Sequence, residues 1–369
     1  MPSIKFKENW EESLQLFDAW FNHKPTGRPL MNLLAVREPD KCLSTGFSSI
    51  DYDSPEDMYL NTDKVFSNLM YESQNTHFMA EAFPQFSMNL GAGSMALYLG
   101  SQPSFAYDTL WFSHFLEDYA SLPLRFDPDN YWFKKHLEIT RRQVELIKDT
   151  DIMVCIPDII ENIDIISAIR DPQTCCLDLY DHPDELKSAL QNISEIYTKY
   201  YDSFYELVKK PNQTVAYTAA GIFCTGKTGK IQCDFSAMLS PSQFDEFILP
   251  SIKRQCDEIP NNLYHLDGPE CLCHVDSLMA IEKLKILQWT SGTRNPRGGD
   301  EAWYDLYKKA RSADKGLCIL LNEYSVEESI YRADALVKKF GANGLFFHFP
   351  VMSQKQAEAL MIKADREWK

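Results

Sequence analysis

Residues 284–289 read Leu-Lys-Ile-Leu-Gln-Trp, residues 317–321 read Leu-Cys-Ile-Leu-Leu, and residues 345–349 read Leu-Phe-Phe-His-Phe. Residues 317–321 are apolar throughout, and the other two runs are apolar apart from Lys285, Gln288 and His348, without a strict alternation of apolar and polar residues. That pattern is typical of parallel strands that are covered on both faces of a sheet. Five further runs of this kind precede them, at residues 30–36, 85–90, 152–156, 214–219 and 263–266.

The segments between these runs have helical patterns with recognisable starts. Residues 184–208 place apolar side chains at helical spacing, and Ser240-Pro241 opens another helix. Ser325 with Glu328, and Ser353 with Gln356, form capping-box pairs. Eight strands that alternate with helices predict a (β/α)8 barrel, the TIM-barrel fold.

Such a barrel needs about 250 residues, and the chain has 369. We place the surplus in an N-terminal helix built on Trp10, Leu14 and Phe17, and in long insertions after the first three strands. The second insertion is rich in aromatic residues, which suits either a satellite core or a lid over the substrate. No linker rich in Pro, Gly or Ser divides the chain, so residues 1–369 are predicted to form one domain.

The composition excludes several classes of partner. Lys and Arg number 37 against 53 Asp and Glu, and the net charge of −16 repels nucleic acid and anionic membranes. No apolar run approaches the roughly 18 residues of a membrane span, and the start of the chain lacks the apolar core of a secretory signal. The ten cysteines are scattered through the chain, several of them inside apolar runs, as in reduced proteins. We therefore predict a soluble cytoplasmic protein.

In a barrel of this type the active site lies at the carboxyl ends of the strands. The polar residues that end the eight runs are therefore candidates for the site. They are Arg37, Asn89, Asp158, Lys227, Lys230, His265, Asp267, Gln288, Asn322, Glu323 and His348.

The sequence His265-Leu266-Asp267 is the sharpest feature of this set. Residues two apart on a strand point to the same side, so the imidazole and the carboxylate converge. His348, at the end of the eighth strand, is a candidate third ligand, and a His, Asp, His set suits Zn²⁺ or another divalent metal. Acid/base chemistry without a metal is an open alternative, as is a structural role in which Asp267 caps residues 268–270.

Three other motifs suggest further chemistry. Basic residues in the loops 226–230 and 294–299, including Lys227 and Arg294, suit either an anionic substrate group or solvated surface charge. Residues 221–228 match the phosphate-binding pattern G-x-x-x-x-G-K-T. An NTPase would require a helix that begins at Lys227, and no helix signal follows this residue. Cys271-x-Cys273-His274 contains only half of a structural zinc site.

The chain resembles the uroporphyrinogen decarboxylase superfamily, and within it the branch of corrinoid-linked methyltransferase-like proteins. The resemblance rests on Tyr264-His-Leu-Asp-Gly-Pro269 and on Ser240-Pro241-x-x-Phe244-x-x-Phe247-x-Leu249-Pro250. It extends to residues 232–236, to Gln288-Trp289 and to the ending Gly344-Leu-Phe-Phe-His348. The resemblance runs from the N-terminal helix to the end of the chain and implies the same barrel.

The family offers two chemistries. Its decarboxylases act on a tetrapyrrole without a cofactor and carry an arginine-rich amino-terminal signature, of which Arg37 resembles a remnant. Its methyltransferases bind zinc through His-x-Cys and a later cysteine, and take the methyl group from a methylcorrinoid protein. Here His265 matches the first ligand, Asp267 stands in place of the cysteine, and His348 lies near the position of the later one. Such ligands leave a metal more Lewis acidic than a thiolate set does, which favours an oxygen or amine substrate.

We therefore predict an enzyme that moves a methyl group between a small substrate and a corrinoid protein or folate-type acceptor. His265, Asp267 and His348 hold the metal in this hypothesis, and Arg37 and Asp234 orient the substrate. The alternatives are a cofactor-free decarboxylase of an anionic substrate and a non-catalytic barrel that binds a corrinoid or tetrapyrrole. The resemblance also implies a homodimer. The residues predicted to bind substrate are Asn89, Asp158, Lys227, Gln288, Trp289, Arg294 and Glu323.

Overall fold

Six parallel strands form the centre of the molecule in a computed structural model that describes residues 4–121 and 124–369. Five of the eight predicted strands lie in this group. A two-residue strand, β14 (Met352–Ser353), and the antiparallel β2 (Thr76–Ala80) extend the sheet beside β1 (Leu30–Val36). The six strands, in sheet order, are β9 (Thr228–Gln232), β10 (Asn261–Asp267), β11 (Ile286–Thr290), β12 (Gly316–Leu320), β13 (Leu345–His348) and β1 (Leu30–Val36).

The other three predicted strands lie in a second sheet. Its order is β3 (Gln85–Phe86), β6 (Met153–Ile156), β7 (Thr214–Tyr217) and β8 (Ile222–Thr225), and only β8 is antiparallel to its neighbour. Within the described residues no hydrogen-bonded ladder joins the two sheets. The fold is therefore a mixed α/β fold with a largely parallel central sheet, compatible with a TIM-like barrel, but the predicted ring is not closed by hydrogen bonds.

The segment after the fourth predicted strand, β7, differs most from expectation. The chain after β7 reverses at Gly221, whose φ of +56° is a left-handed conformation that glycine adopts readily, and returns as β8. It then forms β9, the strand that pairs with β10. Because β9 contains Gly229 and Lys230 and only one large apolar side chain, Ile231, it lacks the pattern by which the other strands were predicted.

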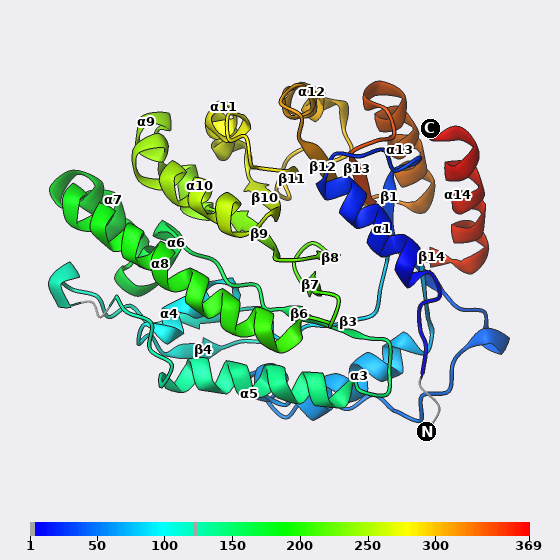
Figure 1. Ribbon diagram of the computed structural model, residues 1–369, viewed down its shortest axis with the longest axis horizontal. Helices are drawn as coiled ribbons and strands as arrows, with labels where there is room; N and C mark the ends of the chain where they lie inside the picture. The colour runs from blue at the N-terminus through cyan, green and yellow to red at the C-terminus, as the bar shows by residue number, and fades with distance from the viewer. Residues whose placement is uncertain (1–3, 122–123) are drawn as a thin grey trace.

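Helices cover the outer side of the six-stranded group, as Figure 1 shows. Ser353 forms the expected capping box with Gln356, whereas the expected box at Ser325 is half formed, its side chain accepting a hydrogen bond from the Glu328 amide. Ser240, predicted as a helix start, also forms a capping box, with Gln243. These covering elements are α9 (Pro241–Gln243), the π-helix η5 (Phe244–Ile248), α10 (Leu249–Glu258), α11 (Val275–Met279), α12 (Tyr304–Ser312), α13 (Val326–Phe340) and α14 (Gln354–Glu367).

The N-terminal helix and the three insertions are present as predicted. Helix α1 (Trp10–Phe21) packs Phe17 and Trp20 against Phe346 of β13. In the second insertion, Phe105 packs against Tyr59 and Trp132, as in a satellite core, whereas Trp111 is exposed. The insertions contain α2 (Pro55–Leu60) and α3 (Thr62–Ser73), then α4 (Met95–Tyr98), β4 (Pro103–Phe105), β5 (Leu110–Phe112) and α5 (Tyr131–Leu146), then α6 (Ile163–Arg170), α7 (Pro172–Asp181) and α8 (Pro183–Val208).

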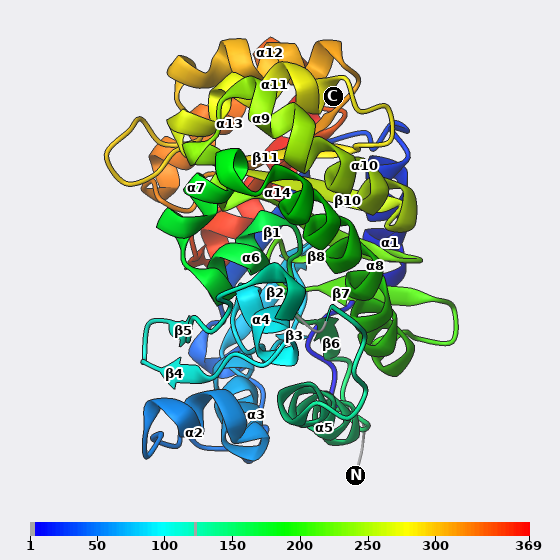
Figure 2. The same ribbon diagram turned by 90° about the vertical axis from the view of Figure 1, so that its left-hand side faces the viewer.

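Figure 2 shows α2, α3 and α5 together at one end of the molecule, far from α11 and α12 at the other. Across residues 4–121 and 124–369, no helix combines the length and the apolar character needed to cross a membrane.

Candidate metal centre

A row of three polar side chains crosses neighbouring strands near their carboxyl ends. His265 of β10 is in register with Gln232 of β9 on one side and with Gln288 of β11 on the other. The His265 Nδ1 lies 3.0 Å from the Gln288 Oε1. Both glutamines are buried, with 5% of their surface exposed, so water competes little for these hydrogen bonds.

Two carboxylates lie just beyond this row. Asp267 ends β10, two residues after His265, and Asp234 opens the 3-10 helix η4 (Asp234–Met238) directly after β9. One possible ligand atom from each of Asp234, His265 and Asp267 lies within 4.8 Å of the other two. The structure thus brings together the predicted pair His265 and Asp267, and the third member of the cluster is Asp234.

The cluster carries negative charge that no cation of the described residues balances directly. Neither Asp234 nor Asp267 forms an ion pair there, since the nearby Lys230 binds Asp158 at 2.8 Å. The pKa of Asp234 is raised, mainly because neighbouring protein restricts the water around its carboxylate, although the residue keeps an exposed side. His265 and Lys230 oppose this shift, and Asp267 adds to it.

Helix α6 positions the loop that carries Asp234. The Asp164 carboxylate accepts hydrogen bonds from the backbone N–H groups of Asp234 and Phe235, at 2.9 and 2.8 Å. Asn162 caps the same helix and donates a hydrogen bond to the Gln232 carbonyl at 2.8 Å. Burial and the neighbouring Asp234 raise the pKa of Asp164 to about 7.

His348 lies elsewhere at the same edge of the sheet. Its strand β13 is the third neighbour of β10, about 14 Å along the sheet at roughly 4.8 Å per strand. The His348 Nδ1 lies 3.1 Å from the Asn32 Nδ2, and a Cβ added to Gly221 would lie 3.7 Å from the His348 ring. Burial under this turn lowers the pKa of His348 to about 4. The structure therefore does not bring His348 into the cluster predicted for it.

A buried polar chain lies beside the cluster. Asp158, in the loop after β6, accepts hydrogen bonds from the Tyr217 hydroxyl and the Lys230 ammonium, each at 2.8 Å. Asp158 is thus close to the site, as predicted, but its carboxylate is held by two protein partners.

Other predicted site residues are engaged away from the cluster. Arg37 donates to the carbonyls of Thr76 and Phe6, and the Asn89 side chain accepts a hydrogen bond from the Gly91 amide. Trp289 faces the other side of the sheet from Gln288 and packs against Trp303, with ring centroids 4.9 Å apart.

The remaining basic and acidic candidates lie on loops. Lys227 precedes β9, at the opposite end of this strand from Asp234, and pairs with Asp202 of α8 at 2.5 Å. Arg294, Asn322 and Glu323 lie in loops after β11 and β12, at the same edge as the cluster, and Arg294 and Glu323 are exposed.

Two motifs adopt structures that do not suit the chemistry they suggested. The sequence 221–228 contains strand β8 and the start of β9, so no helix begins at Lys227 to receive a phosphate. Cys271, Cys273 and His274 lie in the 3-10 helix η6 (Pro269–His274), where Cys271 contacts the Ser236 hydroxyl and His274 the Ser236 carbonyl. Within the described residues the only converging metal-ligand group is Asp234, His265 and Asp267.

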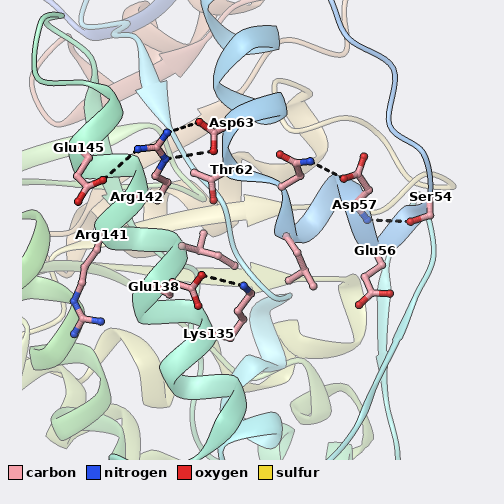
Figure 3. A pocket seen from close by; sticks show the side chains of 13 residues that line it. Ser54, Glu56, Asp57, Thr62, Asp63, Lys135, Glu138, Arg141, Arg142 and Glu145 are labelled. Carbon is pink, nitrogen blue, oxygen red and sulfur yellow. Dashed lines mark hydrogen bonds and ion pairs between the residues drawn. The ribbon is translucent and has the colours of Figure 1, made fainter.

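A groove of about 780 Å³ between α2, α3 and α5 lies outside this centre (Figure 3). Its charges largely neutralise one another: Arg142 binds Asp63 and Glu145, and Lys135 binds Glu138. Among the residues that the structure describes, the groove holds no group of converging metal ligands.

Asp164, Asn162 and Gln232 were not predicted as site residues, although residues 232–236 were part of the family resemblance. Asn162 followed by Asp164 at the start of an apolar helical segment is a recognisable capping signal. The contact of this cap with β9 joins residues 70 positions apart, so the signal does not identify its partner.

No protein-family model matches the chain, and no curated protein matches its sequence. Among solved structures, the chain is similar to a methyltransferase from Methanosarcina mazei, with a TM-score of 0.60 and 10% identity. The likeness covers 97% of this chain and 99% of the other. At this identity it shows the fold, and membership of the uroporphyrinogen decarboxylase superfamily stays a prediction.

Proposed function

We propose that the protein is a metal-assisted methyltransferase-like enzyme, with its metal held by Asp234, His265 and Asp267. The observation that carries the proposal is the convergence of these three groups at the carboxyl ends of parallel strands. The active sites of TIM-barrel enzymes lie at this edge. The fold is shared with a solved methyltransferase, which supports the choice of reaction.

The residues present fit a divalent cation. One imidazole and two carboxylates supply nitrogen and oxygen donors, the set that Zn²⁺ and similar metals accept while keeping positions open for substrate. The two carboxylates lack cationic partners within the described residues. The buried Gln232 Oε1 has no hydrogen-bond partner in the structure, as expected beside a site that a ligand completes.

The chemistry supplied by a bound cation would be Lewis-acid activation of the substrate atom that gives or receives the methyl group. The chain's own residues orient the three side chains that would hold the cation. Gln232 donates a hydrogen bond to the Asp234 Oδ2 at 3.0 Å, and Gln288 accepts one from His265. The exposed Asp234 and Asp267 leave the outer side of the cluster open to substrate.

The methyl carrier belongs to the proposal as well. A corrinoid protein or a folate-type molecule would present the methyl group at this edge, and the chain is proposed to act as a homodimer. Incubation with methylcobalamin and candidate oxygen or amine acceptors, followed by cobalamin absorbance, tests the transfer.

Metal analysis tests the site. Tag-free protein is dialysed against Zn²⁺, Co²⁺ or Mn²⁺, and its metal content is compared with that of His265→Ala and Asp267→Asn. His182→Ala, on the exposed start of α8, is the matched control. We expect one ion per chain in the wild type and the control and a large loss in the two site variants. Negligible metal in all four proteins would refute the metal role.

The decarboxylase alternative depends on groups that the structure places differently. Arg37 binds backbone carbonyls, and Lys227 lies at the far end of β9. Release of CO₂ from anionic candidates without added metal would favour it over methyl transfer. Corrinoid binding without turnover, retained in His265→Ala, would favour the non-catalytic alternative.

A further inference from the structure

We infer that Gln288 is a positioning residue that holds His265 with its proton on Nδ1, so that Nε2 is the atom that faces the metal. The inference rests on the proposed metal site and assigns a role within it. It follows from three features: the contact between the two side chains, the burial of this contact, and the way the neighbouring glutamine is used.

The contact itself sets the direction of the hydrogen bond. The Gln288 Oε1 lies 3.0 Å from the His265 Nδ1, and a carboxamide oxygen only accepts. Nδ1 must therefore carry the proton, and in a neutral imidazole the other nitrogen, Nε2, then has a free lone pair. A metal-bound histidine commonly donates its second ring N–H to such an acceptor, which fixes the ring and its tautomer.

The contact is buried, and the strand that carries Gln288 is packed on its other face. Gln288 is 5% exposed, and it lies opposite His265 on the adjacent strand. The next residue, Trp289, points to the opposite face, is 1% exposed and packs against Trp303. This packing holds β11 in place and with it the backbone of Gln288, opposite the imidazole.

Gln232, the second glutamine of the row, uses the opposite end of its amide group. Gln232 directs its Nε2 to the Asp234 Oδ2 at 3.0 Å, whereas Gln288 directs its Oε1 to His265. A carboxylate needs a donor, and an imidazole N–H needs an acceptor. Each glutamine thus presents the end of its amide that leaves a ligand lone pair free for a cation.

Nuclear magnetic resonance of metal-free protein tests the tautomer directly. The chain has eight histidines, and the signals of His265 are identified by their loss in His265→Ala. Long-range ¹H–¹⁵N spectra at about pH 8, above the ordinary histidine pKa, distinguish the two neutral tautomers. We expect the proton of His265 on Nδ1 in the wild type and in Gln288→Glu, which keeps an acceptor. In Gln288→Met, which has none, we expect it largely on Nε2.

Competition with a chromophoric chelator then measures the consequence for Zn²⁺. Gln288→Met should bind Zn²⁺ about 10- to 100-fold more weakly than the wild type, as is usual when such a partner is lost. Gln288→Glu should restore most of this loss. Far-ultraviolet circular dichroism verifies that each variant is folded, and the wild-type spectrum decides the tautomer even if Gln288→Met is not.

The outcomes separate the inference from the proposed function. If the wild type binds no metal, the proposed function fails. If it binds metal while His265 carries its proton on Nε2, or while Gln288→Met binds Zn²⁺ as the wild type does, the role assigned to Gln288 is wrong.

Discussion

At the scale of single residues, the cluster places two carboxylates near each other, and no cation within residues 4–121 and 124–369 forms an ion pair with either. Such an arrangement stabilises a bound ion and destabilises the metal-free protein by like-charge repulsion. The same residues should therefore affect metal affinity and metal-free stability in opposite directions.

Asp234→Asn tests this opposition. The substitution removes one negative charge and keeps an oxygen, so we expect weaker Zn²⁺ binding together with a metal-free protein more stable by about 1 kcal/mol. Chelator competition and urea unfolding measure the two quantities. Unchanged affinity, or lower metal-free stability, would contradict the role of Asp234.

His348 is predicted to affect stability and its pH dependence rather than metal binding. Its folded pKa of about 4 lies below the unfolded value of roughly 6.5, so the unfolded chain takes up the proton first as pH falls. The stabilisation is complete above about pH 6.5 and is lost toward pH 4, a change of about 3 kcal/mol.

His348→Asn should flatten this loss in urea unfolding between about pH 7 and pH 4. The flattening is partial because His136, also buried, has its pKa lowered to about 4 as well. Zn²⁺ affinity should stay within about threefold of the wild type. A larger loss would indicate that His348 is a metal ligand.

At the scale of elements, the start of α6 and the end of β9 are held together by Asn162. This residue has a left-handed φ of 66°, caps α6 and donates to the Gln232 carbonyl. It thereby sets the position of the loop that carries Asp234.

Asn162→Ala should cost about 3 kcal/mol, since it removes a cap, leaves a carbonyl unpaired and strains an alanine at positive φ. Asn162→Gly removes the side chain without the strain and should be less destabilising, and Ser353→Ala removes a distant cap alone. Only the two Asn162 variants should also weaken Zn²⁺ binding. Equal metal affinity in all three would show that α6 does not position Asp234.

The sequence predicts those elements whose signal is local. The run 317–321 is apolar throughout and the run 284–289 is apolar apart from Lys285 and Gln288, which identifies β12 and β11, and Ser353 with Gln356 identifies the start of α14. Strand β9 was missed because its inward face carries Lys230 and Gln232, whose burial depends on partners in β10 and the Asp158 loop.

The residues of the candidate site, like the strands and helices, are predicted where their signal is local in the sequence. His265 and Asp267 are two residues apart on one strand, so their shared direction is a local property that the sequence contains. His348 is also correctly located at a strand end, but the turn at Gly221 that buries it lies more than 100 residues away in the chain. The sequence near His348 does not predict that this turn buries it.

At the scale of the whole molecule, a metal held between β9 and β10 links the two parts of the chain that carry these strands. Binding to the folded state alone stabilises it by about 2.7 kcal/mol at an ion concentration 100 times the dissociation constant. Zn²⁺ should therefore raise the melting temperature of the wild type by several degrees and leave that of His265→Ala unchanged. Equal shifts in both proteins would place the stabilising ion at another site.

The most direct test of the metal centre is an anomalous difference map from crystals grown with Zn²⁺. We predict a single strong peak bounded by the Nε2 of His265 and by one carboxylate oxygen from each of Asp234 and Asp267. A map with no peak there, or with its strongest peak at Cys271, Cys273 and His274, would contradict the account.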